Sequence, residues 1–275
     1  MKLSVFKKGI RKRLHLLGAV AKFSSQETLA YSFNNWGGVI STVFYTLTFM
    51  AFISIIYSRV KTIAGYDYGE ILFFTLIGQI NFYSLWVWSI PSIRRLVETT
   101  KLGELDIILS RPIPIVWYLS IRRLKLASMV FEGLPALVFP LVLTAQNFHH
   151  HFTVFAVLAG IFTLILGQIL IHCLHFITAC SVIWTGEGKA ISKLIEEIWS
   201  FGETVPYEGF PNPLKLVGTV LIPTLVSSAI STSYFLGKTT NFWFLILLLL
   251  LTIFFLYAKI KMWQFAMRHY SSASS

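Results

Sequence analysis

The stretch Ile93–Pro114, IRRLVETTKLGELDIILSRPIP, lies between two long apolar runs and decides how the rest of the chain is interpreted. It carries seven charged side chains, and an Arg, Lys or Asp at the centre of a membrane helix costs about 2.5 to 3.5 kcal/mol. Its leucines and isoleucines recur at roughly helical spacing, and Pro112 and Pro114 end that pattern. The stretch therefore predicts a short amphipathic helix between two membrane spans, which either lies on lipid headgroups or contacts a partner outside the membrane.

The composition of the whole chain is that of a membrane protein. Of the 275 residues, 55% are hydrophobic and only 13% are charged, whereas about 25% of the residues in an ordinary soluble domain are charged. Several apolar runs of about 20 residues match the length that an α-helix needs to cross a bilayer. We therefore predict an all-α polytopic membrane protein with six transmembrane helices. Five of the spans are expected at residues 38–58, 71–91, 126–146, 153–184 and 241–258.

The regions outside these spans divide the chain into three parts. Residues 1–35 are predicted to form basic amphipathic helices on the membrane surface, because apolar positions from Leu3 to Ala21 share one helical face and the basic side chains lie mainly off it. Residues 36–262 are predicted to form the six-span transmembrane domain. Residues 263–275 are predicted to form a polar tail.

The distribution of basic residues predicts the orientation in the membrane. Residues 1–22 and residues 93–125 each contain seven Lys or Arg, whereas the loop at 59–70 contains two and the loop at 147–152 contains none. Cytoplasmic loops of membrane proteins are enriched in Lys and Arg. Both termini and the Ile93–Pro114 stretch are therefore predicted to be cytoplasmic. The net charge of +11 is explained by this topology, so no nucleic-acid partner is expected.

Hydropathy leaves two interpretations of residues 185–239 open. In the first, residues 188–205 form a cytoplasmic amphipathic helix and residues 214–235 form the fifth crossing. In the second, residues 188–205 are the fifth crossing, and residues 206–236, which contain four prolines, form a helical hairpin that dips into the outer leaflet. Hydropathy favours the first interpretation, because ionisable groups within a span are expensive.

The sequence lacks the usual motifs of catalysis. There is no G-x-x-x-x-G-K-[ST] phosphate loop, no H-E-x-x-H zinc motif and no G-x-S-x-G nucleophile elbow. His172 and His175 share an apolar run with two cysteines, but such residues are more often packing residues than metal ligands. We therefore predict no enzymatic activity and no metal site. The polar candidates for an intramembrane pathway are Gln79, Asn81, Glu196 and Glu197.

Two further observations carry a resemblance to a known family. The run Lys101–Pro114, KLGELDIILSRPIP, is similar to a G-E-L-D-x-x-L-x-R-P signature. A proline-punctuated stretch from Pro206 to Pro223 precedes the run Tyr234–Lys238, YFLGK, and the last span. Both features resemble the permeases of ATP-binding cassette (ABC) exporters of the type-2 class, and more narrowly their six-span subfamily, over nearly the whole chain.

The resemblance implies a fold and a set of partners. The fold has an N-terminal interfacial helix, six spans, a cytoplasmic coupling helix within residues 93–114, and a re-entrant hairpin at residues 206–236, which favours the second interpretation of residues 185–239. Two permease subunits, identical or paralogous, are expected to pair in the bacterial inner membrane. Two separate ATPase subunits, which bind ATP and Mg²⁺, are expected to dock beneath them, and this chain itself needs no cofactor.

The implied function is ATP-driven export of an amphipathic or lipid-like substrate. The coupling segment is expected to seat its leucines in an apolar groove of the ATPase and to fix its orientation with charged residues. This surface consists of Leu102, Gly103, Glu104, Leu105, Asp106, Leu109, Arg111 and Pro112. Two alternatives remain open: a membrane scaffold that anchors a soluble partner without transport, and a membrane-embedded metal enzyme.

Overall fold

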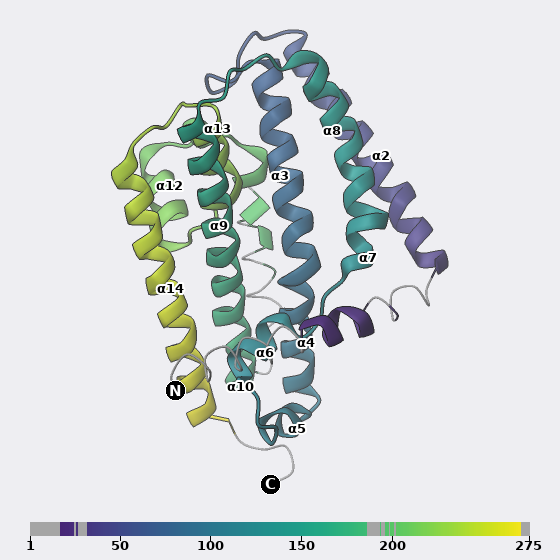
Figure 1. Ribbon diagram of the computed structural model, residues 1–275, viewed down its shortest axis with the longest axis vertical. Coiled ribbons are helices and arrows are strands. Elements are labelled where there is room, and N and C mark those ends of the chain that lie inside the picture. The colour runs from purple at the N-terminus through teal and green to yellow at the C-terminus, as the bar shows by residue number, and fades with distance from the viewer. Residues whose placement is uncertain are drawn as a thin grey trace.

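The protein is an elongated bundle of helices (Figure 1). Within the part of the chain that the structure describes, the secondary structure is helical apart from one isolated bridge between Ile63 and Tyr66. Much of the predicted surface region 1–35 and half of residues 188–205 lie outside that part. The computed structural model describes residues 17–24, 26, 32–185, 193, 196, 197, 199, 200 and 202–270.

Five of the described helices are long and apolar enough to cross a membrane, and they match the five spans predicted above. Three of them run further than predicted at the end of the bundle that carries α5, which is the lower end in Figure 1. The five helices cover Trp36–Tyr57, Tyr68–Lys101, Ile115–Asn147, Val154–Thr185 and Phe242–Arg268.

Several of these long helices are interrupted and consist of shorter elements. The first and the last are continuous, whereas the second, third and fourth are broken near the α5 end. The elements are α2 (Ser32–Tyr57), α3 (Tyr68–Trp88), α4 (Ile90–Lys101), α6 (Ile115–Ile121), α7 (Leu126–Ser128), a π-helix (Met129–Gly133), α8 (Leu134–Asn147), α9 (Val154–Cys180), α10 (Val182–Thr185) and α14 (Phe242–Arg268).

Three N-terminal caps fix the helices at the end opposite α5. The Asp67 carboxylate accepts a hydrogen bond of 2.8 Å from the Glu70 N–H, and the Glu70 carboxylate accepts one of 3.0 Å from the Asp67 N–H. This reciprocal capping box satisfies two N–H groups at the start of α3. The side-chain oxygens of Thr153 and Asn241 cap α9 and α14 in the same way. The capped ends therefore define one face of the bundle.

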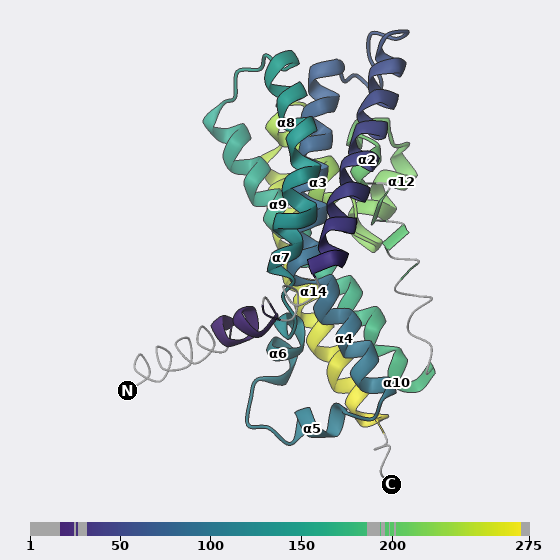
Figure 2. The same ribbon diagram turned by 90° about the vertical axis from the view of Figure 1, so that its right-hand side faces the viewer.

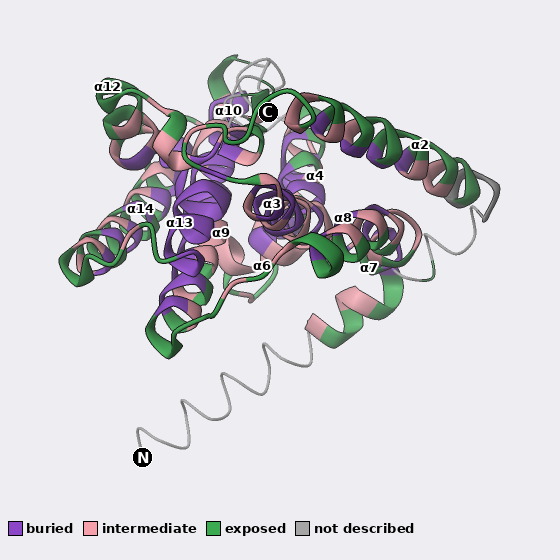
Figure 3. Ribbon diagram, turned by 90° about the horizontal axis from the view of Figure 1, so that it is seen from above, coloured by how far each residue is buried: buried purple, intermediate pink, exposed green. Residues whose placement is uncertain are grey.

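Helix α9 lies at the centre of the bundle, where α3 and α13 (Ser231–Phe235) are also largely buried (Figure 3). Its residues Ala159, Leu166 and Leu170 belong to one apolar core with α3, α13 and α14. Helix α2 lies at the edge and exposes large apolar side chains, such as Phe44 at 72% and Phe52 at 57%. Such side chains suit contact with lipid, where exposure of apolar surface carries no penalty.

The described residues between 193 and 208 follow α4 and α3 from one end of the bundle to the other. Successive residues of this segment contact points progressively further from α5, so the segment runs in the direction opposite to α3. The contacts in chain order are Glu196 with Arg94 (3.4 Å), Trp199 with Phe82 (5.5 Å between ring centroids), Glu203 with Asn81 (2.9 Å) and Glu208 with Tyr66 (2.7 Å).

The region before the last span is a sharply bent pair of helices. Residues Asn212–Leu221 and Val226–Phe235 meet at an angle of 103°. The break contains Pro223, whose missing N–H interrupts the helical hydrogen bonds. Ser227, just after the break, accepts a hydrogen bond of 3.1 Å from Asn81 in the middle of α3. This stretch is therefore either a broken span or a re-entrant loop, and not one straight helix.

Polar contacts fasten the loops at the end opposite α5. The Tyr66 hydroxyl donates a hydrogen bond to Glu208, and Ser233 donates one of 2.6 Å to the same carboxylate. Burial and the neighbouring Glu208 carboxylate raise the pKa of Tyr66, so its hydroxyl remains a donor. The Lys238 ammonium lies 2.9 Å from the Glu70 carboxylate and 4.5 Å from the centre of the Tyr66 ring. These contacts connect the α2–α3 loop to the bent helix pair.

The close contact between α9 and the bent pair gives a stability prediction. A Cβ atom on Gly167 would lie 2.2 Å from Cα and 2.4 Å from N of Ser227, so Gly167→Ala is expected to destabilise the fold by about 1 to 3 kcal/mol through overpacking. The measurement is the Tm of the purified protein in detergent. Gly37→Ala is the matched control, because a Cβ atom there meets nothing within 4 Å and alanine favours the helix. A similar Tm for both variants would contradict the prediction.

Candidate functional site

The predicted coupling segment consists of two helices joined by a tight turn, not of one amphipathic helix. Helix α4 continues from α3 to Lys101, and α5 (Leu105–Leu109) follows the turn. Gly103 has a φ of 71°. Its N–H donates to the Thr100 carbonyl at 3.2 Å, and the Glu104 N–H donates to the Thr99 carbonyl at 3.0 Å. This is a Schellman motif, in which glycine takes the left-handed conformation that ends a helix.

The inner side of α5 is built into the end of the bundle (Figure 2). Leu105 and Ile108 are almost fully buried, with 0% and 3% of their surface exposed, and they join an apolar cluster that includes five other helices. Close packing of this kind makes α5 and its neighbours move together. The other members include Leu96 of α4, Leu119 of α6, Phe176 and Ala179 of α9, Val182 of α10, and Trp263 and Ala266 of α14.

The outer side of α5 and the turn before it expose a different set of side chains from the predicted one. Leu102 is 62% exposed, as predicted, but Leu105 is fully buried and Leu109 is half-buried against the same cluster. Ile107, which was not among the predicted residues, is exposed instead, at 59%. The spacing contains this signal, since Leu105, Ile108 and Leu109 share one helical face and Ile107 lies opposite.

Charged residues hold the turn and α5 in place. The Arg95 guanidinium lies 2.8 Å from Glu98 and 3.4 Å from Glu104, so α4 holds the residue that follows Gly103. Partial burial and the nearby Asp106 carboxylate raise the pKa of Tyr270, which follows α14. Because the ion pairs are partly exposed, each adds at most about 1 kcal/mol to stability, and their main effect is to orient the turn.

Two further predicted residues, Arg111 and Pro112, follow α5 in the chain and are exposed.

The connection between α6 and α7 fastens α4 from its other side. The Arg122 guanidinium donates a hydrogen bond of 2.7 Å to the Thr99 hydroxyl. The Lys125 N–H donates to the Val87 carbonyl at 2.9 Å, near the break between α3 and α4. Helices α4, α5 and α6 therefore form one unit at this end of the bundle.

Two of the predicted intramembrane polar residues lie on α3. Asn81 is fully buried, and its amide donates to Glu203 at 2.9 Å and to Ser227 at 3.1 Å. The Gln168 amide on α9 donates to both the side chain and the backbone carbonyl of Asn81. Gln79 is half-buried on the same helix. The Asn81 amide thus links three segments of the bundle, as buried polar groups in a membrane commonly do.

The other two predicted polar residues lie elsewhere. Glu196 is close to Arg94 on α4, and Glu197 is exposed near the same helix, so neither joins Asn81. The acid that does so, Glu203, was not predicted. The available signal was its position in the stretch 188–205, which one interpretation placed within the membrane.

A second buried polar cluster fixes the break between α3 and α4. The Lys259 ammonium donates to the Ser120 hydroxyl at 2.6 Å and lies 2.9 Å from Nε2 of His172. Nδ1 of His172 lies 2.8 Å from the hydroxyl of Ser89, the residue at the break. Both ring nitrogens of His172 are therefore occupied. Across the described ranges, no group of three or more His, Cys, Asp or Glu side chains is arranged to hold a metal ion.

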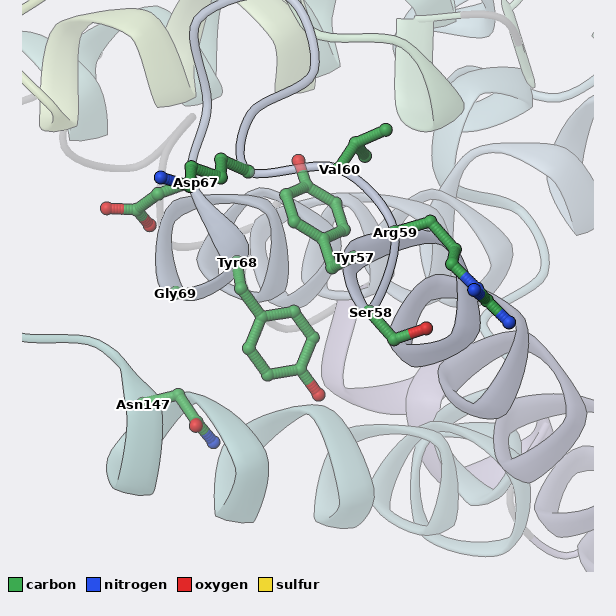
Figure 4. A pocket seen from close by; sticks show the side chains of 9 residues that line it. Tyr57, Ser58, Arg59, Val60, Asp67, Tyr68, Gly69 and Asn147 are labelled. Carbon is green, nitrogen blue, oxygen red and sulfur yellow. The ribbon is translucent and has the colours of Figure 1, made fainter.

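A shallow hollow of about 520 Å³ lies at the end opposite α5 (Figure 4). Tyr57, Arg59 and Asp67 from the α2–α3 region line it together with Asn147 at the end of α8. The Asp67 carboxylate already caps α3, and the Tyr57 hydroxyl donates to the Tyr66 carbonyl at 3.0 Å. These groups serve the fold of the loop, and we assign the hollow no ligand.

Comparison with known proteins connects this arrangement to one family. The model of a family described as ABC-2 family transporter protein matches residues 42–274. The match includes the α4–α5 unit, the bent helix pair and the last span. No curated protein and no solved structure matches the chain.

Proposed function

Because the chain belongs to the ABC-2 transporter family, we propose that this membrane permease is the transmembrane subunit of an ATP-driven exporter. A separate ATPase subunit docks on the coupling segment, residues 93–114, through the surface formed by Leu102–Pro112, and a second permease subunit completes the pathway. The substrate is an amphipathic or lipid-like molecule that moves out of the cytoplasm. ATP and Mg²⁺ are bound by the ATPase, and this chain carries out no chemical step.

The observation that carries the proposal is the anchoring of α5. The inner face of α5 is packed against the ends of α9 and α14, whereas Ile107 on its outer face and Leu102 in the turn before it are exposed to solvent. An exposed apolar pair on a polar rim is suited to contact with a protein groove. A force applied to this surface reaches two membrane spans through packed side chains, so ATP-driven movement of a docked ATPase has a direct route to the transmembrane helices.

The length of α3 and α4 argues against a helix that merely lies on lipid headgroups. The 21 residues of α3 extend about 31 Å at 1.5 Å per residue, which matches the hydrocarbon thickness of a bilayer. The 12 residues of α4, which carry four charged side chains, extend about 18 Å further. We infer that α4 holds α5 away from the membrane surface, where a soluble subunit has access to it.

The path of residues 193–235 supports six crossings. The described part of 193–208 follows α3 from the α5 end to the opposite end, as a fifth crossing does. The bent pair reaches the middle of the bundle at Ser227 and returns to Ser233 at the far end, as expected for a re-entrant hairpin. With the basic segments on the cytoplasmic side, we infer that α5 is cytoplasmic and that the Tyr66–Glu208 contact is outside.

The experiment that tests the proposed function is co-expression with a candidate ABC ATPase from the same organism. We expect the two proteins to purify together and the complex to hydrolyse ATP faster in lipid than the ATPase does alone. A stable complex without stimulated hydrolysis would favour the scaffold alternative.

The orientation is tested by placing a cysteine at Ser110. The native Cys173 and Cys180 are buried, so they give little background labelling. Labelling of Ser110→Cys by a membrane-impermeant reagent added to intact cells would place α5 outside the cell and would overturn the proposed function.

A further inference from the structure

A groove beside α4 has the properties of a ligand site. It has a volume of about 730 Å³ and lies between α4, with the turn after it, and the described residues Lys193, Glu196 and Glu197. This volume is within the range of small-molecule sites, about 300 to 1,000 Å³. Ile90, Ile93 and Val97 form the apolar part of its wall. One of its eleven lining residues, Leu102, also belongs to the proposed ATPase surface, and the other ten lie outside that surface.

A buried histidine without hydrogen bonds lines the groove. His175 is 2% exposed, and neither of its ring nitrogens has a hydrogen-bond partner within the described part of the chain. The Trp199 ring lies 6.2 Å from the His175 ring between centroids. Its buried indole N–H also has no hydrogen-bond partner within the described part of the chain. An unsatisfied buried polar group costs about 1 to 3 kcal/mol. A ligand with a hydrogen-bonding headgroup would satisfy the imidazole and remove this cost.

The charges around the groove balance. Its wall contains three basic and three acidic side chains. Arg94 lies 3.4 Å from Glu196 within the wall, and Glu98 lies 2.8 Å from Arg95, which is outside it. A purely anionic headgroup would meet the three carboxylates, whereas a headgroup with both charges meets complementary partners. The charged residues are Arg94, Lys101, Lys193, Glu98, Glu196 and Glu197.

We propose that this groove binds a zwitterionic amphiphile, with a phosphate and an amine in its headgroup. The phosphate lies toward the basic side chains and His175, the amine lies toward Glu197, and the acyl chains leave the groove past Ile90, at the end of α4 that adjoins α3. The inference rests on the proposed function only for the role of this ligand as a transported substrate. Binding itself is measured on the permease alone, without ATPase or nucleotide, so a failure of binding and a failure of coupling are separate results.

The test compares three lipids with the purified full chain in detergent. Phosphatidylethanolamine carries both charges, phosphatidylglycerol carries the phosphate alone, and diacylglycerol carries neither. Native mass spectrometry and the lipid-dependent rise in Tm give the affinities. We expect one site at which phosphatidylethanolamine binds about tenfold more tightly than phosphatidylglycerol, with no site for diacylglycerol. Equal binding of the two phospholipids would overturn the proposal, because it indicates general solvation by lipid.

Variants separate a ligand contact from a packing role. His175→Phe removes no hydrogen bond within the described chain, so we expect an unchanged Tm without lipid and about a tenfold loss of phosphatidylethanolamine affinity. His151→Phe, in the exposed 148–153 loop, is the matched control and should bind normally. Glu197→Gln should weaken phosphatidylethanolamine selectively, since only that lipid has an amine. Unchanged affinity in both His175→Phe and Glu197→Gln would overturn the site.

Discussion

Replacing Ile107 with Asp is expected to abolish stable association with the ATPase while leaving the permease folded. The Ile107 side chain is 59% exposed, so the substitution removes little packing within the chain. In the proposed complex it lies in the centre of an apolar contact, where burying an unpaired carboxylate costs 2 kcal/mol or more, on the order of a thirtyfold loss of affinity. The measurement is the Kd of the detergent-purified permease for the ATPase, with Tm as the test of folding.

Val60→Asp is the matched control for this experiment. Val60 is also an exposed apolar residue, at 41%, but it lies in the loop at the opposite end of the bundle. We expect Val60→Asp to bind the ATPase as the wild type does. Normal ATPase binding by Ile107→Asp would show that the exposed face of α5 is not the docking surface.

Replacing Gly103 with Val is expected to uncouple ATP hydrolysis from the permease. A β-branched residue is a strong outlier at the φ of 71° found here, and the left-handed conformation costs an ordinary residue about 1 to 2 kcal/mol. The turn then opens, and α5 no longer points along the end of α4. We expect stimulation of the ATPase by the permease to fall about tenfold or more, measured in proteoliposomes at equal amounts of inserted protein.

Gly237→Val separates coupling from simple backbone strain. Gly237 also has a positive φ, of 66°, and a Cβ atom there meets nothing within 4 Å. Both substitutions therefore introduce a similar strain, but Gly237 lies at the end opposite α5. An equal loss of stimulation in the two variants would contradict a specific role for the turn at Gly103.

The spans were predictable because each is an apolar run long enough to cross a bilayer, a signal that needs no knowledge of packing. The ends of the spans on the α5 side were not predictable, since α4 is polar enough to be assigned to a separate amphipathic helix, whereas it continues α3 and buries Leu96 and Val97 in the cluster that holds α5. The direction in which Leu105 points follows from the same cluster. Its partners Phe176 and Trp263 are far away in sequence, and nothing local to the GELD run identifies them.

The polar residues of the bundle show a similar limit. Asn81 was identified because an amide in an apolar run is conspicuous, and the structure places it in a buried cluster. Its partner Glu203 lies 122 positions away, at the edge of a stretch for which hydropathy left two interpretations open. Grouping Glu196 and Glu197 with Asn81 came from residue type alone. Side-chain chemistry indicates which groups need partners, but not which ones the fold supplies.

The contacts of Ser89 have a consequence for how a transport cycle moves this protein. A break held by packing alone would bend gradually. The break at Ser89 is instead held by Lys259, His172 and Ser120 through short, directional contacts in a buried site. Such bonds are either made or broken, because a half-broken one leaves a charged ammonium without a partner. If the proposed transport cycle bends the chain at Ser89, we expect this break to switch between two discrete positions and not to bend gradually.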